Sequence, residues 1–204
     1  MRSTLMLVVC ASLGLASCES SPTDVKSDAA ASKAEPAKKE SAKEEAGEQE
    51  IDVVDLAADA KIRLSQALAT ALAAKPGDAV AAELEGDVEN GKRSVAYEVA
   101  IVDADGVVWA VKVDHVTGKV ASVEKEDEAD EIEEFKEKRE AAGAEHLSLA
   151  ELLLRGTKAA KGTPVEVTFR GKKHAGQARV ELVDGRTKSS VTLDAKTGKV
   201  LEKK

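Results

Sequence analysis

The chain contains one unit twice, and this internal repeat limits the possible folds more than any other feature. Residues 64–77 align with residues 149–162 at a constant offset of 85, and residues 114–120 align with residues 194–200 at an offset of 80. The difference between the two offsets is absorbed by turns between strands, where deletions are tolerated. We therefore expect two copies of one small fold.

The spacing of apolar residues predicts a helix followed by antiparallel strands in each copy. In the first copy, apolar residues recur at helical spacing from Leu64 to Leu72, and Pro76-Gly77 ends the helix. Three runs of alternating apolar residues follow, then a short final strand that begins near Val120, with turns at residues 103–106 and 114–118. The expected fold class is α+β, with two copies of a helix followed by a three- to four-stranded antiparallel sheet.

The two predicted helices begin differently. Ser148 and Glu151 form a capping-box pattern at the start of the second helix. Arg63 stands at the equivalent position of the first copy, so the start of that helix is open, and an earlier cap at Asp55 or Asp59 is the alternative.

The first copy is expected to carry the larger core. Tyr97 and Trp109 correspond to Ala178 and Ser189 of the second copy, where both rings are lost, and Phe169 takes the place of Leu84. Tyr97 and Trp109 alternate with valines in their strands, which favours core packing over a platform for a small molecule.

The N-terminus has the pattern of a bacterial lipoprotein signal over residues 1–17. The apolar stretch from Leu5 to Leu15 is too short to span a bilayer and is typical of a signal-peptide core. It ends in Leu15-Ala16-Ser17-Cys18, which resembles the lipobox and marks Cys18 for lipidation. The alternative is an ordinary secretory signal with a chance cysteine. We therefore expect an extracytoplasmic protein that is lipid-anchored to a bacterial membrane. Glu19, the residue after the lipidated cysteine, resembles an outer-membrane sorting signal. In a Gram-negative cell the protein would then lie on the periplasmic side of the outer membrane.

Composition divides the rest of the chain into four segments. Residues 18–50 are rich in Ser, Ala, Lys and Glu and predict a disordered tether. Residues 51–125 form the first unit and residues 147–204 the second. The connecting residues 126–146 predict an acidic, solvated helix, in which Ile132 and Phe135 could touch a neighbour.

No pattern of catalytic or ligand-binding residues stands out. The net charge of -8 argues against nucleic acid as a partner. His115, His146 and His174 are expected to face solvent, and neither a His-Glu-x-x-His motif nor a phosphate-binding or dinucleotide-binding loop occurs. We therefore expect no catalytic residues, no cofactor and no metal site.

Two acidic stretches could suggest a cation site, but each has a simpler interpretation. Asp103 and Asp105 with Gly106 begin like a calcium loop, yet the further acidic ligands are missing and a hairpin turn explains them. The stretch Glu124–Glu134 could attract divalent cations weakly, but a solvated helix face is the favoured interpretation.

The closing motif of each copy resembles that of the PepSY domain. It spans Val113–Val120, read as Val-Asp-His-Val-Thr-Gly-Lys-Val, and is echoed by Leu193–Val200. The likeness covers Ile62–Glu124 and Leu147–Glu202, although the second copy lacks the tyrosine. The resemblance implies a tandem PepSY-domain bacterial lipoprotein, and it implies inhibition or modulation of peptidases, since similar domains occur in propeptides of secreted thermolysin-type proteases.

The leading hypothesis is therefore a non-enzymatic, membrane-anchored lipoprotein that binds a protein partner, a peptidase, through an open sheet face or an edge strand. The alternative is an envelope sensing or scaffolding protein that binds a ligand or partner without a role in proteolysis, with two weak sites acting together.

Overall fold

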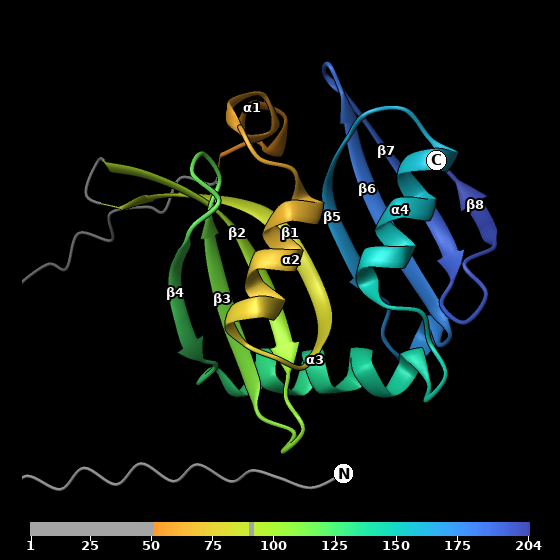
Figure 1. Cartoon of the computed structure of the whole chain (residues 1–204). Coiled ribbons are helices and arrows are strands. Elements are labelled where there is room, and N and C mark those ends of the chain that lie inside the picture. The colour runs from red at the N-terminus through yellow and green to blue at the C-terminus, as the bar shows by residue number, and fades with distance from the viewer. Residues whose placement is uncertain (1–50, 90–91) are drawn as a thin grey trace, which may run out of the picture. The chain divides into compact units, whose positions relative to one another are not determined.

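The computed structural model describes residues 51–89 and 92–204, and the expected signal peptide, Cys18 and tether lie outside this part of the chain. The first repeat begins with two helices, and its four strands follow in chain order (Figure 1). These elements are α1 (Val53–Asp59), α2 (Leu64–Ala74), β1 (Asp78–Glu89), β2 (Lys92–Val102), β3 (Val108–Asp114) and β4 (Val120–Lys125).

After a connecting helix, α3 (Ala129–Ala142), the second repeat again has a main helix followed by four strands, but its described residues contain no counterpart of α1. A single turn of 3₁₀ helix, η1 (Lys172–His174), lies between its first two strands. Its other elements are α4 (Leu149–Ala159), β5 (Thr163–Phe169), β6 (Gln177–Asp184), β7 (Thr187–Asp194) and β8 (Val200–Lys203). The α+β fold class and the two helix-then-strand units are confirmed.

All eight strands belong to one antiparallel sheet, in the order β4-β3-β2-β1-β5-β6-β7-β8. The sheets of the two repeats therefore join through their first strands, which the sequence did not predict. The join is short, because β1 and β5 pair only at Ala81 with Thr168, Ala82 with Val167, and Glu83 with Glu166. We call this three-pair junction the seam.

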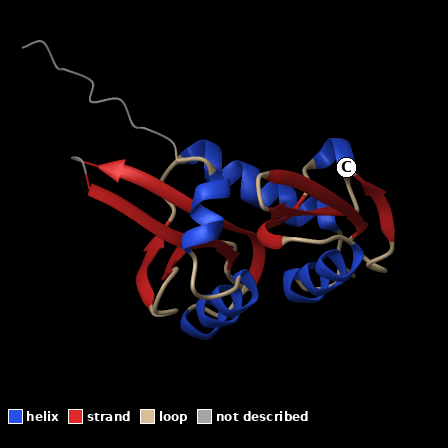
Figure 2. Ribbon diagram, turned by 90° about the horizontal axis from the view of Figure 1, so that it is seen from above, coloured by secondary structure: helices blue, strands red, loops and turns tan. Residues whose placement is uncertain are grey.

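Helices cover both faces of the sheet. Helices α2 and α4 pack on one face, each mainly against the strands of its own repeat. Helix α3 crosses the opposite face beneath strands of both repeats (Figure 2). The residues of β1 alternate in burial because successive side chains point to opposite faces. Val80, Ala82 and Leu84 are buried, whereas Glu83 and Glu85, which point to the other face, are half-buried.

The two repeats make an equivalent backbone hydrogen bond just before each main helix and share the same backbone conformation in the closing turn. The Ile62 N–H donates to the His115 carbonyl at 3.1 Å, and the Leu147 N–H donates to the Ala195 carbonyl at 2.8 Å. In the turns, Gly118 and Gly198 adopt φ values of 69° and 68°, which glycine reaches without steric cost. Residues that the two sequence offsets align therefore occupy equivalent positions in the two repeats.

The core also follows the expected correspondence between copies. In the first repeat Leu84, Tyr97 and Val113 lie opposite one another on β1, β2 and β3. The equivalent row of the second repeat is Phe169, Ala178 and Leu193. The aromatic residue of the row is Tyr97 on the second strand of the first repeat and Phe169 on the first strand of the second repeat. Each row therefore has one aromatic side chain with no exposed surface. Among the described residues, buried apolar side chains are more numerous in the first repeat, as expected.

The helix starts agree with the sequence in one copy and differ in the other. Ser148 Oγ accepts from the Glu151 N–H at 3.4 Å and Glu151 Oε2 accepts from the Ser148 N–H at 3.0 Å, which confirms the capping box. The suggested earlier cap of the first helix at Asp55 or Asp59 is wrong. Helix α2 begins at Leu64, and a separate short helix, α1, is capped by Asp52, whose Oδ1 accepts from the Val54 N–H at 3.0 Å.

The connecting helix α3 is less solvated than expected, because it packs on the sheet. Ile132 and Phe135 contact the hydrophobic core, and Ala142 is buried. Arg139 donates from Nε to Asp78 at the start of β1, at 3.2 Å, while the Glu137 side chain accepts from the Lys172 N–H in η1 at 2.8 Å. Helix α3 thereby bridges the two repeats. Among the described residues, no helix has the length and apolar character needed to cross a membrane.

Candidate functional site

A row of four glutamates crosses the centre of the sheet on the face that α3 partly covers. Strand register places Glu98, Glu83, Glu166 and Glu181 side by side on β2, β1, β5 and β6. The row exists only because the seam brings β1 and β5 together, so each repeat contributes two of its members. Directly opposed residues on neighbouring strands lie about 4.5–5.5 Å apart at Cβ, close enough for their charges to interact.

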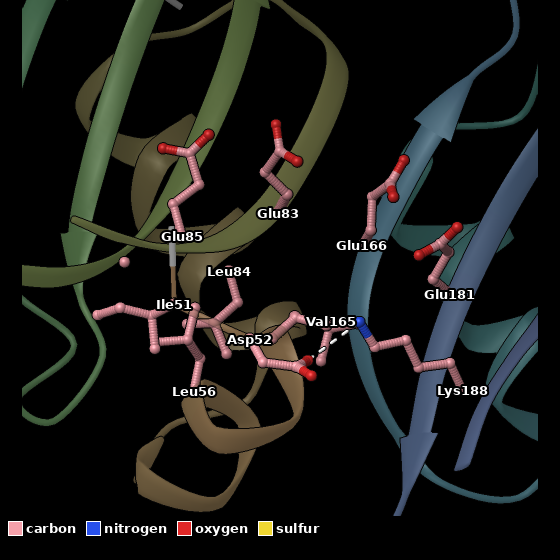
Figure 3. Close-up of a pocket in the computed structure, with 12 residues that line it drawn as sticks. Ile51, Asp52, Leu56, Glu83, Leu84, Glu85, Val165, Glu166, Glu181 and Lys188 are labelled. Carbon is pink, nitrogen blue, oxygen red and sulfur yellow. Dashed lines mark ion pairs between the residues drawn. The ribbon is translucent and has the colours of Figure 1, made fainter. Parts of the chain in front are cut away.

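Beside this row lies a groove with a volume of about 590 Å³ (Figure 3). Carboxylates of Glu83, Glu85, Glu166 and Glu181 line one part of it, and apolar side chains line another. The apolar part comprises Ile51, Val53, Leu56, Leu84 and Val165. The groove therefore combines apolar surface with concentrated negative charge.

Helix α1 forms a wall of the groove, and two contacts fix its position. Asp52 Oδ1 lies 3.0 Å from Lys188 Nζ on β7, an ion pair visible in Figure 3. Leu56 is buried against Gly86, where an added Cβ would lie only 2.5 Å from Leu56 Cδ2. Glycine at this position lets α1 approach β1 closely, so that the first helix of one repeat lies beside the seam.

Burial raises the pKa of Glu83 and of Glu166 above the usual range for glutamate. Neighbouring glutamates raise both values further, and nearby cations oppose the effect. Arg179 Nη2 lies 3.5 Å from Glu166 and 2.8 Å from Glu181, and Lys138 of α3 lowers the pKa of both central glutamates. Ionisation of the two central carboxyls is therefore disfavoured.

The groove lining combines carboxylates with aliphatic side chains. Its lining residues are aliphatic or carry a carboxylate or ammonium group, and none supplies a hydroxyl, thiol or imidazole. In the described part of the chain, no cluster of three or more His, Cys, Asp or Glu side chains has an arrangement suited to a metal ion. Carboxylates next to apolar surface fit a partner that presents basic and apolar side chains together.

Two of the three histidines are not where the sequence suggested. His174 is exposed, as expected, but His115 is half-buried and its Nδ1 lies 2.7 Å from the Val95 carbonyl oxygen. His146 contacts Phe169 edge-on, with ring centroids 4.7 Å apart, and its Nε2 lies 3.3 Å from Asp78. Solvent exposure was therefore wrong for both, because tertiary contacts that local sequence does not reveal cover these rings.

Asp103 and its neighbours form the hairpin turn that the sequence favoured. Asp103 Oδ1 accepts from the Asp105 and Val107 N–H groups, each at 3.0 Å. Its Oδ2 accepts from Lys75 Nζ at 3.0 Å and from Trp109 Nε1 at 2.8 Å. These donors, led by the Lys75 ammonium, hold the pKa of Asp103 well below its usual range. Both oxygens of this carboxylate are used within the protein.

The two rings of the first repeat have different surroundings. Tyr97 is fully buried, which confirms its expected place in the core, and its hydroxyl donates to the Ile62 carbonyl at 2.9 Å. Trp109 is only half-buried, with Lys75 Nζ 3.8 Å from the centroid of its ring. The acidic stretch Glu124–Glu134 is largely exposed and lies apart from the groove lining.

Sequence reasoning missed the glutamate row. The alternation in Ala82-Glu83-Leu84-Glu85 and in Val165-Glu166-Val167 could have placed these glutamates on one sheet face of each repeat. Local sequence contains no signal that β1 pairs with β5. The composite groove therefore could not be predicted from either repeat alone.

The comparison with protein families agrees with the two-repeat architecture. The family described as "Peptidase propeptide and YPEB domain", or PepSY, matches residues 61–124 and 147–204. A crystal structure of a candidate lipoprotein from Clostridium difficile 630 is similar at 19% identity, covering 72% of this chain and 94% of that chain, with a TM-score of 0.41. No curated protein matches the chain. The two family matches coincide with the two helix-then-sheet repeats and together span more than half of the chain, which therefore belongs to the PepSY family and carries its domain in tandem.

Proposed function

We propose that this protein is a non-enzymatic, extracytoplasmic PepSY lipoprotein that binds peptidases and modulates their activity by inhibition. The observation that carries the proposal is the tandem match to a domain whose family description names peptidase propeptides. The groove supports it, because its lining offers charge and apolar surface for binding a protein segment. Since the chain shows no protease motif, inhibition would act on a separate peptidase.

The membrane anchor is the second part of the proposal. Residues 1–17 would direct export, Cys18 would carry the lipid, and residues 18–50 would tether the two PepSY domains, at 51–125 and 147–204, on either side of the acidic connecting helix at 126–146. Metabolic labelling with a radioactive fatty acid tests this directly. Wild type should become labelled, whereas Cys18→Ser should not, because it lacks the cysteine that would carry the lipid. A labelled Cys18→Ser protein would contradict the assignment.

The groove is the proposed docking surface for the peptidase. Four carboxylates from two repeats, together with the apolar residues of α1, fit a segment that combines basic and apolar side chains. Such a surface speeds association through electrostatic steering, so binding should weaken as ionic strength rises.

Titration against a panel of envelope and secreted peptidases tests the function. The protein should slow cleavage by at least one peptidase, and Glu181→Lys in the groove should weaken that inhibition by about tenfold or more. Glu124→Lys on β4 is the matched control, since it makes the same charge change outside the groove. Unchanged cleavage across the whole panel, with cross-linking in cells to a signalling or assembly protein, would instead support the sensing or scaffolding alternative.

A further inference from the structure

The seam between the two PepSY domains combines a short contact with an unfavourable pair of charges. Only three residue pairs connect β1 with β5, and the last of these sets Glu83 directly against Glu166. Each of these glutamates has a second glutamate on its other side, Glu98 or Glu181. Like charges directly opposed on neighbouring strands destabilise the pairing. An ordinary sheet would place neutral or oppositely charged residues at such a position.

Other charged groups face the seam from every element around it. Lys112 of β3 pairs with Glu98 at 3.1 Å, which neutralises one end of the row. Arg179 of β6 pairs with Glu181 and approaches Glu166. Lys138 of α3 acts on both central glutamates but is also paired with Glu134 at 2.7 Å. Asp52, Glu85 and Lys188 are the other charged residues that line the groove beside the row.

The cations balance the outer glutamates better than the central pair. Glu83 makes no ion pair within 4.0 Å among the described residues, and Arg179 lies closer to Glu181 than to Glu166. Both central glutamates are also half-buried. Burial weakens screening by water and salt, so repulsion across the seam persists where surface charges would be screened.

We propose that the seam is a pH-sensitive junction, in which the pairing of β1 with β5 is weakest when Glu83 and Glu166 are both charged and tightens when either is protonated. A protonated carboxyl removes the repulsion and supplies an O–H donor to the opposing carboxylate. Mild acid therefore strengthens the connection between the two PepSY domains, and neutral pH loosens it. The junction also affects the groove, because Glu83, Glu166 and Glu181 of the row line it.

The sign follows from the direction of the two pKa values. Both carboxyls bind a proton more readily in the folded chain than in the unfolded chain, so stability increases as the pH falls through the raised values toward the ordinary value of 4.5. Carboxyls with lowered pKa, such as Asp114 and Asp194, lose their stabilising effect only near or below their ordinary value of 3.8. Protonation of Glu83 and Glu166 should therefore stabilise the seam between neutral pH and about pH 4.5.

Hydrogen exchange of the full chain, read by mass spectrometry, measures the seam directly. Exchange protection, corrected for the intrinsic pH dependence of amide exchange, is compared at pH 7.5 and pH 5.0 for peptides that contain residues 79–84 and 165–169. Protection there should be about threefold to tenfold higher at the lower pH. A peptide from the β7–β8 hairpin serves as the internal control for changes in overall stability, because these strands carry no member of the glutamate row.

Substitutions separate the seam from other acid effects. Glu83→Gln should give high protection at both pH values and remove most of the pH dependence, and Glu166→Gln should act in the same direction. Glu133→Gln on the exposed surface of α3 should leave the wild-type pH dependence intact. The proposal is overturned if wild-type seam peptides show no pH dependence beyond that of the β7–β8 peptide, or if Glu83→Gln keeps the wild-type response. Peptidase inhibition plays no part in this measurement, so its outcome is independent of the proposed function.

Discussion

At the scale of single residues, equivalent positions of the two repeats keep their bonding role more faithfully than their identity. Asp114 and Asp194 each accept from the hydroxyl and N–H of the threonine three residues later, at 2.6 to 2.7 Å. These bonds, the hydroxyl first, lower the pKa of both carboxyls. The turn chemistry is thus identical in both copies, whereas the aromatic ring of the core sits on β2 in one copy and on β5 in the other.

Tyr97 gives a prediction that one absorbance titration can check. Burial raises the pKa of its hydroxyl to about 12. The chain has one tyrosine, so phenolate absorbance reports this residue alone. We expect a midpoint near 12 in the folded protein, against about 10 in concentrated urea. Because the pKa is higher in the folded protein, the stabilising contribution of this hydroxyl is fully present below about pH 10 and is lost as the pH rises through the folded-state pKa.

Two results would check the structural cause. Tyr97→Phe removes the hydrogen bond to the Ile62 carbonyl and should cost about 1 kcal/mol in the free energy of unfolding. A folded-state midpoint near 10 would contradict the burial of this hydroxyl.

At the scale of elements, the two main helices differ in their first turn, and the repeat supplies a reciprocal test. Gln66 Oε1 accepts from the Arg63 N–H at 3.1 Å, but a guanidinium has no acceptor to return the bond. Ser148→Ala should therefore destabilise the protein by about 1 kcal/mol, and Arg63→Ser should stabilise it by up to about 1 kcal/mol. Urea unfolding measures both. Equal effects of the same sign would contradict this account of the caps.

Helix α4 packs closer to its sheet than an alanine would allow. A Cβ added to Gly156 would lie 2.6 Å from Val180 Cγ2, although Ala71 occupies the equivalent position of α2. We expect Gly156→Ala to destabilise the protein by about 1–2 kcal/mol, because overpacking exceeds the gain in helix propensity. The cost should shrink in a Val180→Ala background, since the clashing methyl groups are then absent. A stabilising Gly156→Ala would show that α4 has room to move.

At the scale of the whole molecule, the continuous sheet and the single core cluster predict that both domains unfold together. Trp109 of the first domain is the only tryptophan, so its fluorescence reports that domain alone. Leu182 of the second domain is fully buried, and Leu182→Ala should cost about 2–5 kcal/mol. We expect this change in the second domain to lower the urea midpoint that Trp109 reports.

The matched control is the same substitution at an exposed position of the second domain. Leu154 is 55% exposed, so Leu154→Ala should leave the midpoint nearly unchanged. If Leu182→Ala shifts circular dichroism but leaves the Trp109 transition in place, the two domains unfold independently.

The features that could be predicted from the sequence depend on contacts between residues close in the chain. The capping box at Ser148, the Asp103 turn and the alternating burial around Tyr97 each depend on residues within a few positions of one another, and the repeat doubled the evidence for them. His146 and Ile132 were harder to place, because their environment comes from Asp78, Phe169 and the back of the sheet. These contacts join segments that local periodicity does not relate.

The sequence by itself determined two α+β PepSY units, their turns and the residues of their separate cores, because hydrophobic period and turn chemistry act locally. Only the tertiary structure decided that β1 pairs with β5, since strand edges of two similar units can meet in many ways and side-chain pattern alone does not choose among them. That choice sets Glu83 against Glu166 and builds the groove. The candidate site is therefore a property of the joined pair, created where two local folds share one sheet.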